Sequence, residues 1–213
     1  NKKNTINIGA VYTLGRTLHG DAYKYHQTGA ESNGSIYVQS QTGDTIPNPF
    51  KMPHTFGIGL TYVYDNRLTI GVDYTLQKWN TADLAWSKFN KESVEMNSRT
   101  KIAFGAEFVP SYISHNYLKR IRYRMGAYYS SPYNKVSYTS PDTGTTSFQD
   151  GAREYGVSIG FGLPMFQSKS MLNISGQYIK VSPKFKGLME ENYLRINIGL
   201  TFNERWFMKW KVD

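Results

Sequence analysis

The stretch LRINIGLTF, residues 194–202, alternates strictly between apolar and polar side chains. Successive side chains of an extended strand point to opposite faces, so alternation of this kind predicts a strand with one apolar and one polar face. A register shift of one residue would exchange the two faces, and the pattern therefore specifies one orientation. The apolar face carries Leu194, Ile196, Ile198, Leu200 and Phe202, and the polar face carries Arg195, Asn197, Gly199 and Thr201.

Seven more segments repeat this alternation, each about 9–11 residues long, which is the length of a tilted strand that crosses a membrane. A ninth segment, residues 18–27, is less regular, and residues 35–41 are a candidate for one further strand. The apolar stripes of the seven are Ile6, Ile8, Ala10, Tyr12 and Leu14; Ile58, Leu60 and Tyr62; Ile70, Val72 and Tyr74; Ile102, Phe104, Ala106 and Phe108; Ile121, Tyr123, Met125, Ala127 and Tyr129; Val157, Ile159, Phe161 and Leu163; and Leu172, Ile174 and Tyr178.

The connections between these segments alternate in length. Short ones are expected at residues 15–17, 65–66, 110–117 and 164–170, and long ones at 28–53, 81–97, 131–152 and 182–192. Outer-membrane barrels have short periplasmic turns and longer outer loops. We therefore expect an all-β fold, an antiparallel up-and-down transmembrane β-barrel over residues 1–202, followed by a carboxyl-terminal tail at the periplasmic rim, residues 203–213.

Composition agrees with a barrel of the outer membrane. Taken alone, the mean hydropathy of −0.52 would suggest a soluble protein. The polar, lumen-facing residues of barrel strands lower such an average, so the value is compatible with a barrel. No apolar run approaches the roughly 20 residues of a membrane-spanning helix. The chain has no cysteine, so disulfide and thiolate chemistry are excluded for this sequence. Aromatic residues near strand ends on the apolar face predict girdles at the two membrane interfaces: Tyr12, Tyr62, Tyr64, Tyr74, Phe108, Tyr129, Tyr178 and Phe202.

Two regions resemble a known family of outer-membrane transporters. The hairpin of residues 53–80, with TFGIGLTY, the turn Asp65-Asn66, RLTIGVDY and Trp79, resembles the FadL/TodX family. The motifs EYG at 154–156, FGLP at 161–164, ENY at 191–193 and GLTFNERWF at 199–207 are similar to the variant of that family in Bacteroidota. The resemblance implies fourteen strands, of which this chain supplies strands six to fourteen, and passive uptake of small hydrophobic compounds such as fatty acids. Nine strands would be an odd number for a closed bacterial barrel, so further strands are expected elsewhere in the protein.

A second function is compatible with the same residues, namely a structural barrel subunit of a larger outer-membrane secretion or assembly complex. Other outer-membrane proteins would then be its partners. On either interpretation the chain also meets outer-membrane lipids and lipopolysaccharide through basic loop residues. The net charge of +9 does not form a continuous basic face, so we expect no nucleic-acid partner.

The candidate binding residues are charged side chains on the lumen-facing stripe. Alternation places Arg120, Arg122 and Arg124 together on one strand, with Glu107 and Glu154 on the neighbouring strands. Asp73 and Arg195 also point inward. Cross-strand charge pairs of this kind can fill and stiffen a lumen. Alternatively the arginines bind an anionic head group, for which a guanidinium is suited.

We expect neither an enzyme nor a cofactor. The string GVSIG, residues 156–160, matches the nucleophile elbow G-x-S-x-G, but Ser158 falls in the middle of a predicted strand. The elbow requires a strand-turn-helix followed by Asp and His, and every histidine precedes Ser158. The histidines have no metal-ligand spacing and are expected in loops or at strand ends: His19, His26, His54 and His115.

Overall fold

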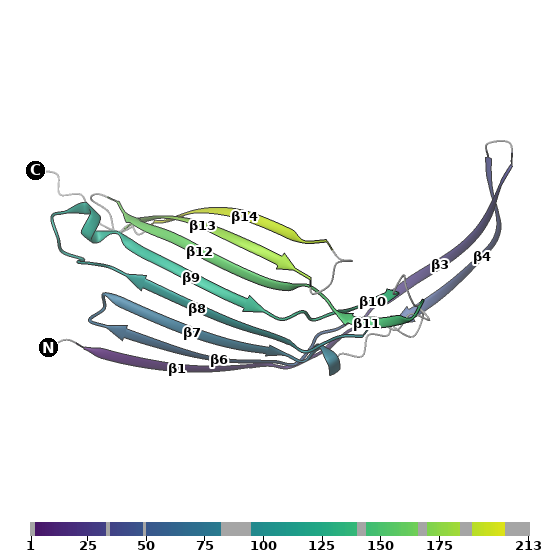
Figure 1. The fold of residues 1–213 in the computed structure, drawn as a ribbon, viewed down its shortest axis with the longest axis horizontal. Helices are drawn as coiled ribbons and strands as arrows, with labels where there is room; N and C mark the ends of the chain where they lie inside the picture. The colour runs from purple at the N-terminus through teal and green to yellow at the C-terminus, as the bar shows by residue number, and fades with distance from the viewer. Residues whose placement is uncertain are drawn as a thin grey trace, which may run out of the picture.

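The structure, a computed structural model, describes residues 3–32, 35–48, 50–81, 95–139, 144–165, 170–183 and 189–202. One broad, curved sheet makes up most of it, and two-stranded ribbons leave the sheet at one end (Figure 1). The predicted all-β, antiparallel class is confirmed. No helix in the described ranges is long and apolar enough to cross a membrane.

The sheet has eight strands in the order β1-β6-β7-β8-β9-β12-β13-β14, and every neighbouring pair is antiparallel. These are the eight segments that the alternation predicts. Their bounds are Asn4–Thr13 (β1), Thr55–Tyr64 (β6), Leu68–Gln77 (β7), Arg99–Phe108 (β8), Arg122–Ser130 (β9), Arg153–Pro164 (β12), Met171–Ser182 (β13) and Glu191–Thr201 (β14).

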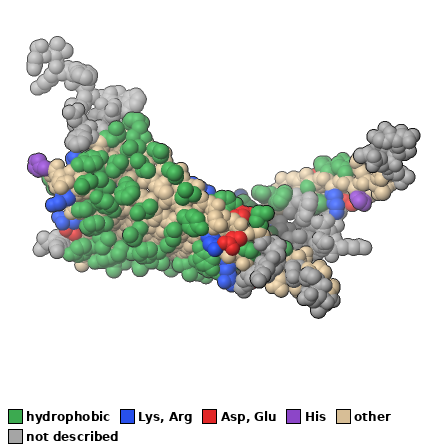
Figure 2. All heavy atoms as spheres, turned by 45° about the horizontal axis from the view of Figure 1, so that its top comes forward, with side chains coloured by type: hydrophobic (Ala, Val, Ile, Leu, Met, Phe, Trp, Pro, Cys, Tyr) green, Lys and Arg blue, Asp and Glu red, His purple; other side chains and the backbone are tan. Residues whose placement is uncertain are grey.

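One face of this sheet, here called the apolar face, is almost wholly hydrophobic and exposed (Figure 2). Ile8 is 74% exposed and Ile198 is 72% exposed, although they lie on strands at opposite edges. Over the described residues the sheet is a single layer, so none of them forms a second layer against the large hydrophobic side chains of this face. The predicted stripes are confirmed, and the apolar face needs an apolar environment outside the described chain.

Short turns and long excursions lie at opposite ends of the sheet, as the alternating lengths predict. At the turn end, Asp65 and Asn66 both have positive φ (50° and 54°), which suits the type I′ turn of a two-residue hairpin. At the loop end, four excursions leave between β1 and β6, β7 and β8, β9 and β12, and β13 and β14. The predicted short turn at residues 15–17 is wrong, because β1 pairs with β6 and not with the segment that follows it.

The excursion between β1 and β6 is a long two-stranded ribbon. It contains β2 (Thr17–Leu18) paired with β5 (Phe50–Lys51), then β3 (Asp21–Ser32) paired with β4 (Ser35–Pro47). The residue numbers of two paired residues add up to 68 at every pair from Asn4–Tyr64 to Thr28–Ser40, which means that the register is constant over this length. The register then shifts at Thr28/Gly29. The ribbon therefore continues the β1–β6 hairpin in one register far beyond the sheet (Figure 1).

This ribbon corrects two predictions. Residues 18–27 are not a ninth strand of the wall, since β2 and β3 pair within the ribbon. Residues 28–53 are not an open loop, and the strand left open at 35–41 is part of β4. The ribbon extends beyond the sheet that carries the apolar face, and its strands pair only with each other among the described residues (Figure 1).

Smaller elements complete the two ends. The strands β10 (Lys135–Thr139) and β11 (Thr146–Asp150) pair in a second ribbon at the loop end, within the predicted loop 131–152. The 3-10 helix η1 (Trp79–Thr81) follows β7 there, and η3 (Tyr117–Arg120) precedes β9 at the turn end.

The described sheet is open. Strands β1 and β14 are its two edges, and neither pairs with the other or with a further described strand on its outer side. A closed barrel is therefore not formed by the described residues. The predicted tail, residues 203–213, lies outside the described ranges.

Candidate functional site

The opposite face of the sheet, here called the polar face, gathers charged side chains into two clusters. The turn-end cluster comprises Glu107, Arg122, Arg124 and Asn173, and the loop-end cluster comprises Arg99, Tyr128, Ser130 and Glu154. The sequence places Glu107 and Glu154 on either side of one arginine run. The structure separates them, because Glu154 pairs in register with Ser130 at the far end of β9.

The turn-end cluster is built on three strands. Arg124 Nε donates to Glu107 Oε2 at 2.6 Å, and Arg122 donates to Glu107 Oε1 at 3.2 Å. Arg124 also donates to Asn173 Oδ1 at 2.8 Å. One carboxylate therefore holds two guanidinium groups, and the strands β8, β9 and β13 are tied together across the polar face. The cluster retains one excess positive charge.

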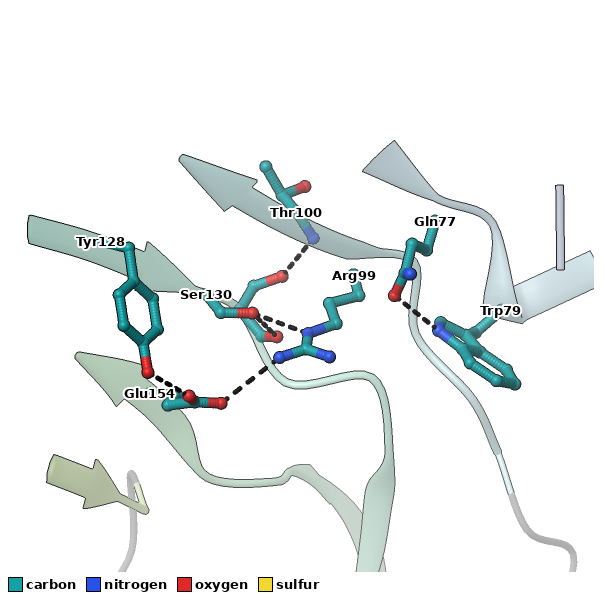
Figure 3. Close-up of polar contacts among 8 residues, drawn as sticks. Gln77, Trp79, Arg99, Thr100, Tyr128, Ser130 and Glu154 are labelled. Carbon is teal, nitrogen blue, oxygen red and sulfur yellow. Dashed lines mark hydrogen bonds and ion pairs between the residues drawn. The ribbon is translucent and has the colours of Figure 1, made fainter. Parts of the chain in front are cut away.

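The loop-end cluster centres on Glu154 (Figure 3). Tyr128 donates to Glu154 Oε1 at 2.5 Å, and Arg99 donates to Glu154 Oε2 at 3.3 Å and to Ser130 Oγ at 2.7 Å. The ammonium group of Lys101 lies 4.5 Å from the centre of the Tyr128 ring. Beside this cluster is a cavity of about 330 Å³, whose lining includes Arg99, Ser130 and Glu154.

A glycine makes room for the loop-end cluster. Gly156 lies beside Tyr128 on the polar face, and a Cβ at Gly156 would overlap the Tyr128 ring. Any side chain there would displace the ring and, with it, the hydrogen bond to Glu154. Of the alternating glycines in β12, Gly156 is therefore the one that leaves space for the Tyr128 ring.

Three predicted site residues lie outside both clusters. Arg120 belongs to η3 and not to β9, so it does not continue the Arg122–Arg124 stripe; its guanidinium lies 5.6 Å from the centre of the Tyr117 ring. Asp73 lies on the polar face of β7, opposite Gly59, and Arg195 lies on β14, opposite Gln177. Asp73 and Arg195 point to the predicted face without joining a cluster.

Four side chains of the clusters were not predicted. Arg99 shares the parity of Lys101, two residues later on the same strand, so the sequence contains the signal for its place on the polar face. Tyr128 and Ser130 share the parity of Arg122 and Arg124, which is a signal that the sequence does contain. Asn173 is brought to Arg124 only by the register of β9, β12 and β13, which no single segment reveals.

The catalytic and metal motifs find no supporting geometry. Ser158 lies in the middle of β12, as predicted, and its Oγ donates weakly to the Gly126 carbonyl at 3.5 Å. No His, Asp or Glu grouping able to hold a metal occurs within the described ranges. Of the histidines, His54 immediately precedes β6, whereas His26 lies inside β3 and not in a loop.

The two clusters supply paired charges that tie strands together across the polar face. Comparison with known proteins adds one finding: a family model described as BamG matches residues 1–213. No curated protein and no solved structure matches the chain. The resemblance to the FadL/TodX family is therefore wrong, because the model that spans the entire chain describes a different family.

Proposed function

The chain belongs to the BamG family, and we propose that it is a structural β-sheet subunit of the BAM-type complex that assembles proteins in the bacterial outer membrane. This function corresponds to the second interpretation of the sequence, a barrel subunit of an assembly complex. Uptake of fatty acids rested on the resemblance to FadL/TodX and loses its basis with it. We further propose that the subunit has no catalytic step and no cofactor of its own.

The observation that carries the proposal is the exposed apolar face across eight strands. These strands are 9–12 residues long, and at about 3.3 Å per residue a tilted strand of this length crosses the hydrocarbon layer of a membrane. Burying the face in lipid would remove the exposed hydrophobic surface that a soluble protein could not tolerate. Membership of the BamG family supports a location at the bacterial outer membrane, and burial of the apolar face in lipid would hold the chain there.

The two open edges favour a subunit over an isolated sheet. In lipid, each unpaired backbone N–H or C=O group costs several kcal/mol, so β1 and β14 require partner strands on their outer sides. We therefore propose that the eight strands are one sector of a barrel wall, with the polar face turned to its interior. In that position the two charged clusters stiffen the wall, and ligand binding by their arginines stays a prediction.

Membership of the complex is tested by isolating the tagged, full-length protein from its own outer membrane. We expect outer-membrane assembly proteins to co-purify, and depletion of the protein to lower the amounts of other outer-membrane proteins. A protein that purifies alone, and whose depletion leaves those amounts unchanged, would overturn the proposal.

Lipid contact is tested separately with nitroxide labels. This sequence has no cysteine, so single substitutions Ile159→Cys and Ser158→Cys place a label on the apolar or the polar face of one strand. We expect the label at 159 to be reached by oxygen dissolved in lipid and the label at 158 by a water-soluble nickel complex. Equal access of the nickel complex to both positions would exclude lipid contact.

A further inference from the structure

At the loop end, where the apolar face meets the base of the long ribbon, is a pocket of about 210 Å³. We call it the rim pocket. Its side chains come from the segment after β1 and from the segment before β6, with one residue from η1. It is lined by Gly15, Arg16, Thr17, Lys51, Met52, Pro53, His54 and Thr81.

Close approach of two chain segments builds the rim pocket. The Met52 N–H donates to the Arg16 carbonyl at 2.7 Å, and Thr17 pairs with Lys51, so Arg16 lies opposite Met52 and Lys51 lies one position further along the ribbon. Gly15 permits this approach, since a Cβ there would lie 2.7 Å from the Met52 carbonyl oxygen. Arg16 and Lys51 therefore both belong to the paired backbone at the base of the ribbon.

His54 adds a hydrogen-bond donor. The backbone N–H of Gly15 lies 3.2 Å from His54 Nδ1, and the Tyr12 hydroxyl lies 2.7 Å from the same atom. A backbone N–H can only donate, so Nδ1 is an acceptor and the proton of the neutral ring is on Nε2. The Nε2 N–H is then the donor that this histidine offers to a ligand.

The rim pocket adjoins the apolar face through stacked rings. The Tyr12 ring is parallel to the His54 ring within 7°, with 5.9 Å between centroids, and lies 4.9 Å from Phe56. The ammonium group of Lys78 lies 5.6 Å from the centre of the Phe56 ring. Tyr12 and Phe56 belong to the apolar face, so hydrophobic surface and cationic groups meet here within one side-chain cluster.

Among the described residues, the cations of the rim pocket have no carboxylate partner. The lining contains no carboxylate, and within the described ranges no Asp or Glu oxygen forms an ion pair with Arg16 or Lys51. By contrast, both arginines of the turn-end cluster share Glu107. The rim pocket is therefore the part of the described surface where an incoming anion would find two uncompensated charges and a donor.

We propose that the rim pocket binds a phosphate group carried by a membrane lipid whose acyl chains lie along the apolar face. The volume is below the roughly 300–1,000 Å³ of pockets for drug-sized ligands, so it suits a compact group. Guanidinium and ammonium groups both bind phosphate. The inference rests on the proposed contact of the apolar face with lipid, and that contact explains why the anion would arrive with acyl chains attached.

The test measures retention of phosphatidate by the full-length protein in vesicles of a phosphate-free galactolipid. Diacylglycerol in place of phosphatidate has the same chains without the phosphate, and inorganic phosphate alone has the phosphate without the chains. The variant Arg16→Gln/Lys51→Gln removes both cations. The control Lys3→Gln/Arg67→Gln removes two positive charges at the turn end of the sheet, one just before β1 and one in the turn between β6 and β7.

We expect the Arg16→Gln/Lys51→Gln variant to bind phosphatidate roughly tenfold or more weakly, because it lacks both cationic groups that would hold the phosphate in the rim pocket. The control variant should change binding less than about twofold, and diacylglycerol should show no dependence on either variant. Unchanged binding by the rim variant would overturn the inference. So would inorganic phosphate binding as tightly as phosphatidate, because the site would then serve the free ion.

The label at position 159, read in the same vesicles, separates this inference from the proposed function. If that label is exposed to water, the proposed contact of the apolar face with lipid is wrong. If it is in lipid and the rim variant still retains phosphatidate, the rim pocket inference alone is wrong.

Discussion

The two faces of the eight-stranded sheet share one backbone ladder and differ in how their side chains are held. On the polar face, side chains have particular partners, such as Glu107 with two arginines and Tyr128 with Glu154. On the apolar face, aliphatic side chains such as Ile159, which is 57% exposed, have no group that could form a directed polar bond. We therefore expect substitutions on the apolar face to change stability through the polarity of the new side chain. Substitutions on the polar face should change stability through the particular contacts that they make or break.

The largest expected effect breaks the polarity of the apolar face. Replacing Ile159 by Lys should lower the free energy of unfolding by roughly 2–4 kcal/mol, the cost of a lysine at the bilayer midplane. The adjacent Ser158→Lys on the polar face should cost much less. Unfolding by urea in phospholipid vesicles measures both, and equal losses would contradict the assignment of the faces.

The next effect breaks the position-specific packing of the polar face. Gly156→Ala places a Cβ against the Tyr128 ring and should destabilise the sheet by about 1–3 kcal/mol, as overpacking does. Gly105→Ala is the matched control, because a Cβ there has no atom within 4 Å. The same urea titration compares them. If Gly105→Ala is as damaging as Gly156→Ala, the Tyr128 ring is not the cause.

A smaller effect sharpens the account of the charged clusters. Glu107→Gln leaves Arg122 and Arg124 without their shared carboxylate and should cost about 1 kcal/mol, kept low because these groups are about one-third exposed. Asp65→Asn is the control, since its 3.5 Å pair with Arg67 is more exposed. Stability in vesicles at low and high salt measures both variants. A larger loss for Asp65→Asn would refute the ranking.

The smallest effect is expected at the rim, which belongs to neither face. Arg16→Gln/Lys51→Gln should change the free energy of unfolding by less than about 0.5 kcal/mol, because neither side chain has an ion-pair partner among the described residues. Urea unfolding without phosphatidate gives this value. A loss as large as that of Gly156→Ala would mean that these side chains hold the ribbon to the sheet.

The sequence predicts the eight strands and their faces because period-two alternation is local, and each stripe can be read without its neighbours. The alternation does not predict the pairing of β1 with β6, because these strands are far apart in the sequence and are brought together by the ribbon between them. Arg120 was placed on the strand, although Asn116 accepts from the Leu118 N–H at 3.0 Å and caps η3, a local signal that was readable. The family was misassigned because Gly-rich alternating hairpins are common to many barrel strands.

The long ribbon also bears on the order in which the chain folds. Joining strands separated by residues 14–54 would ordinarily cost loop-closure entropy, which grows with the logarithm of loop length. Here β3–β4, β2–β5 and β1–β6 are nested in one register, so pairing that begins near the ribbon tip brings each successive pair together over a short distance. Each closed pair shortens the loop for the next, and the edge strand β1 reaches its partner as the final step of a zipper. The pairs from Thr28–Ser40 down to Asn4–Tyr64 share one register, so a slip in this part of the ribbon would be transmitted to the sheet, where it would turn the stripe of Ile6 and Ile8 to the wrong face.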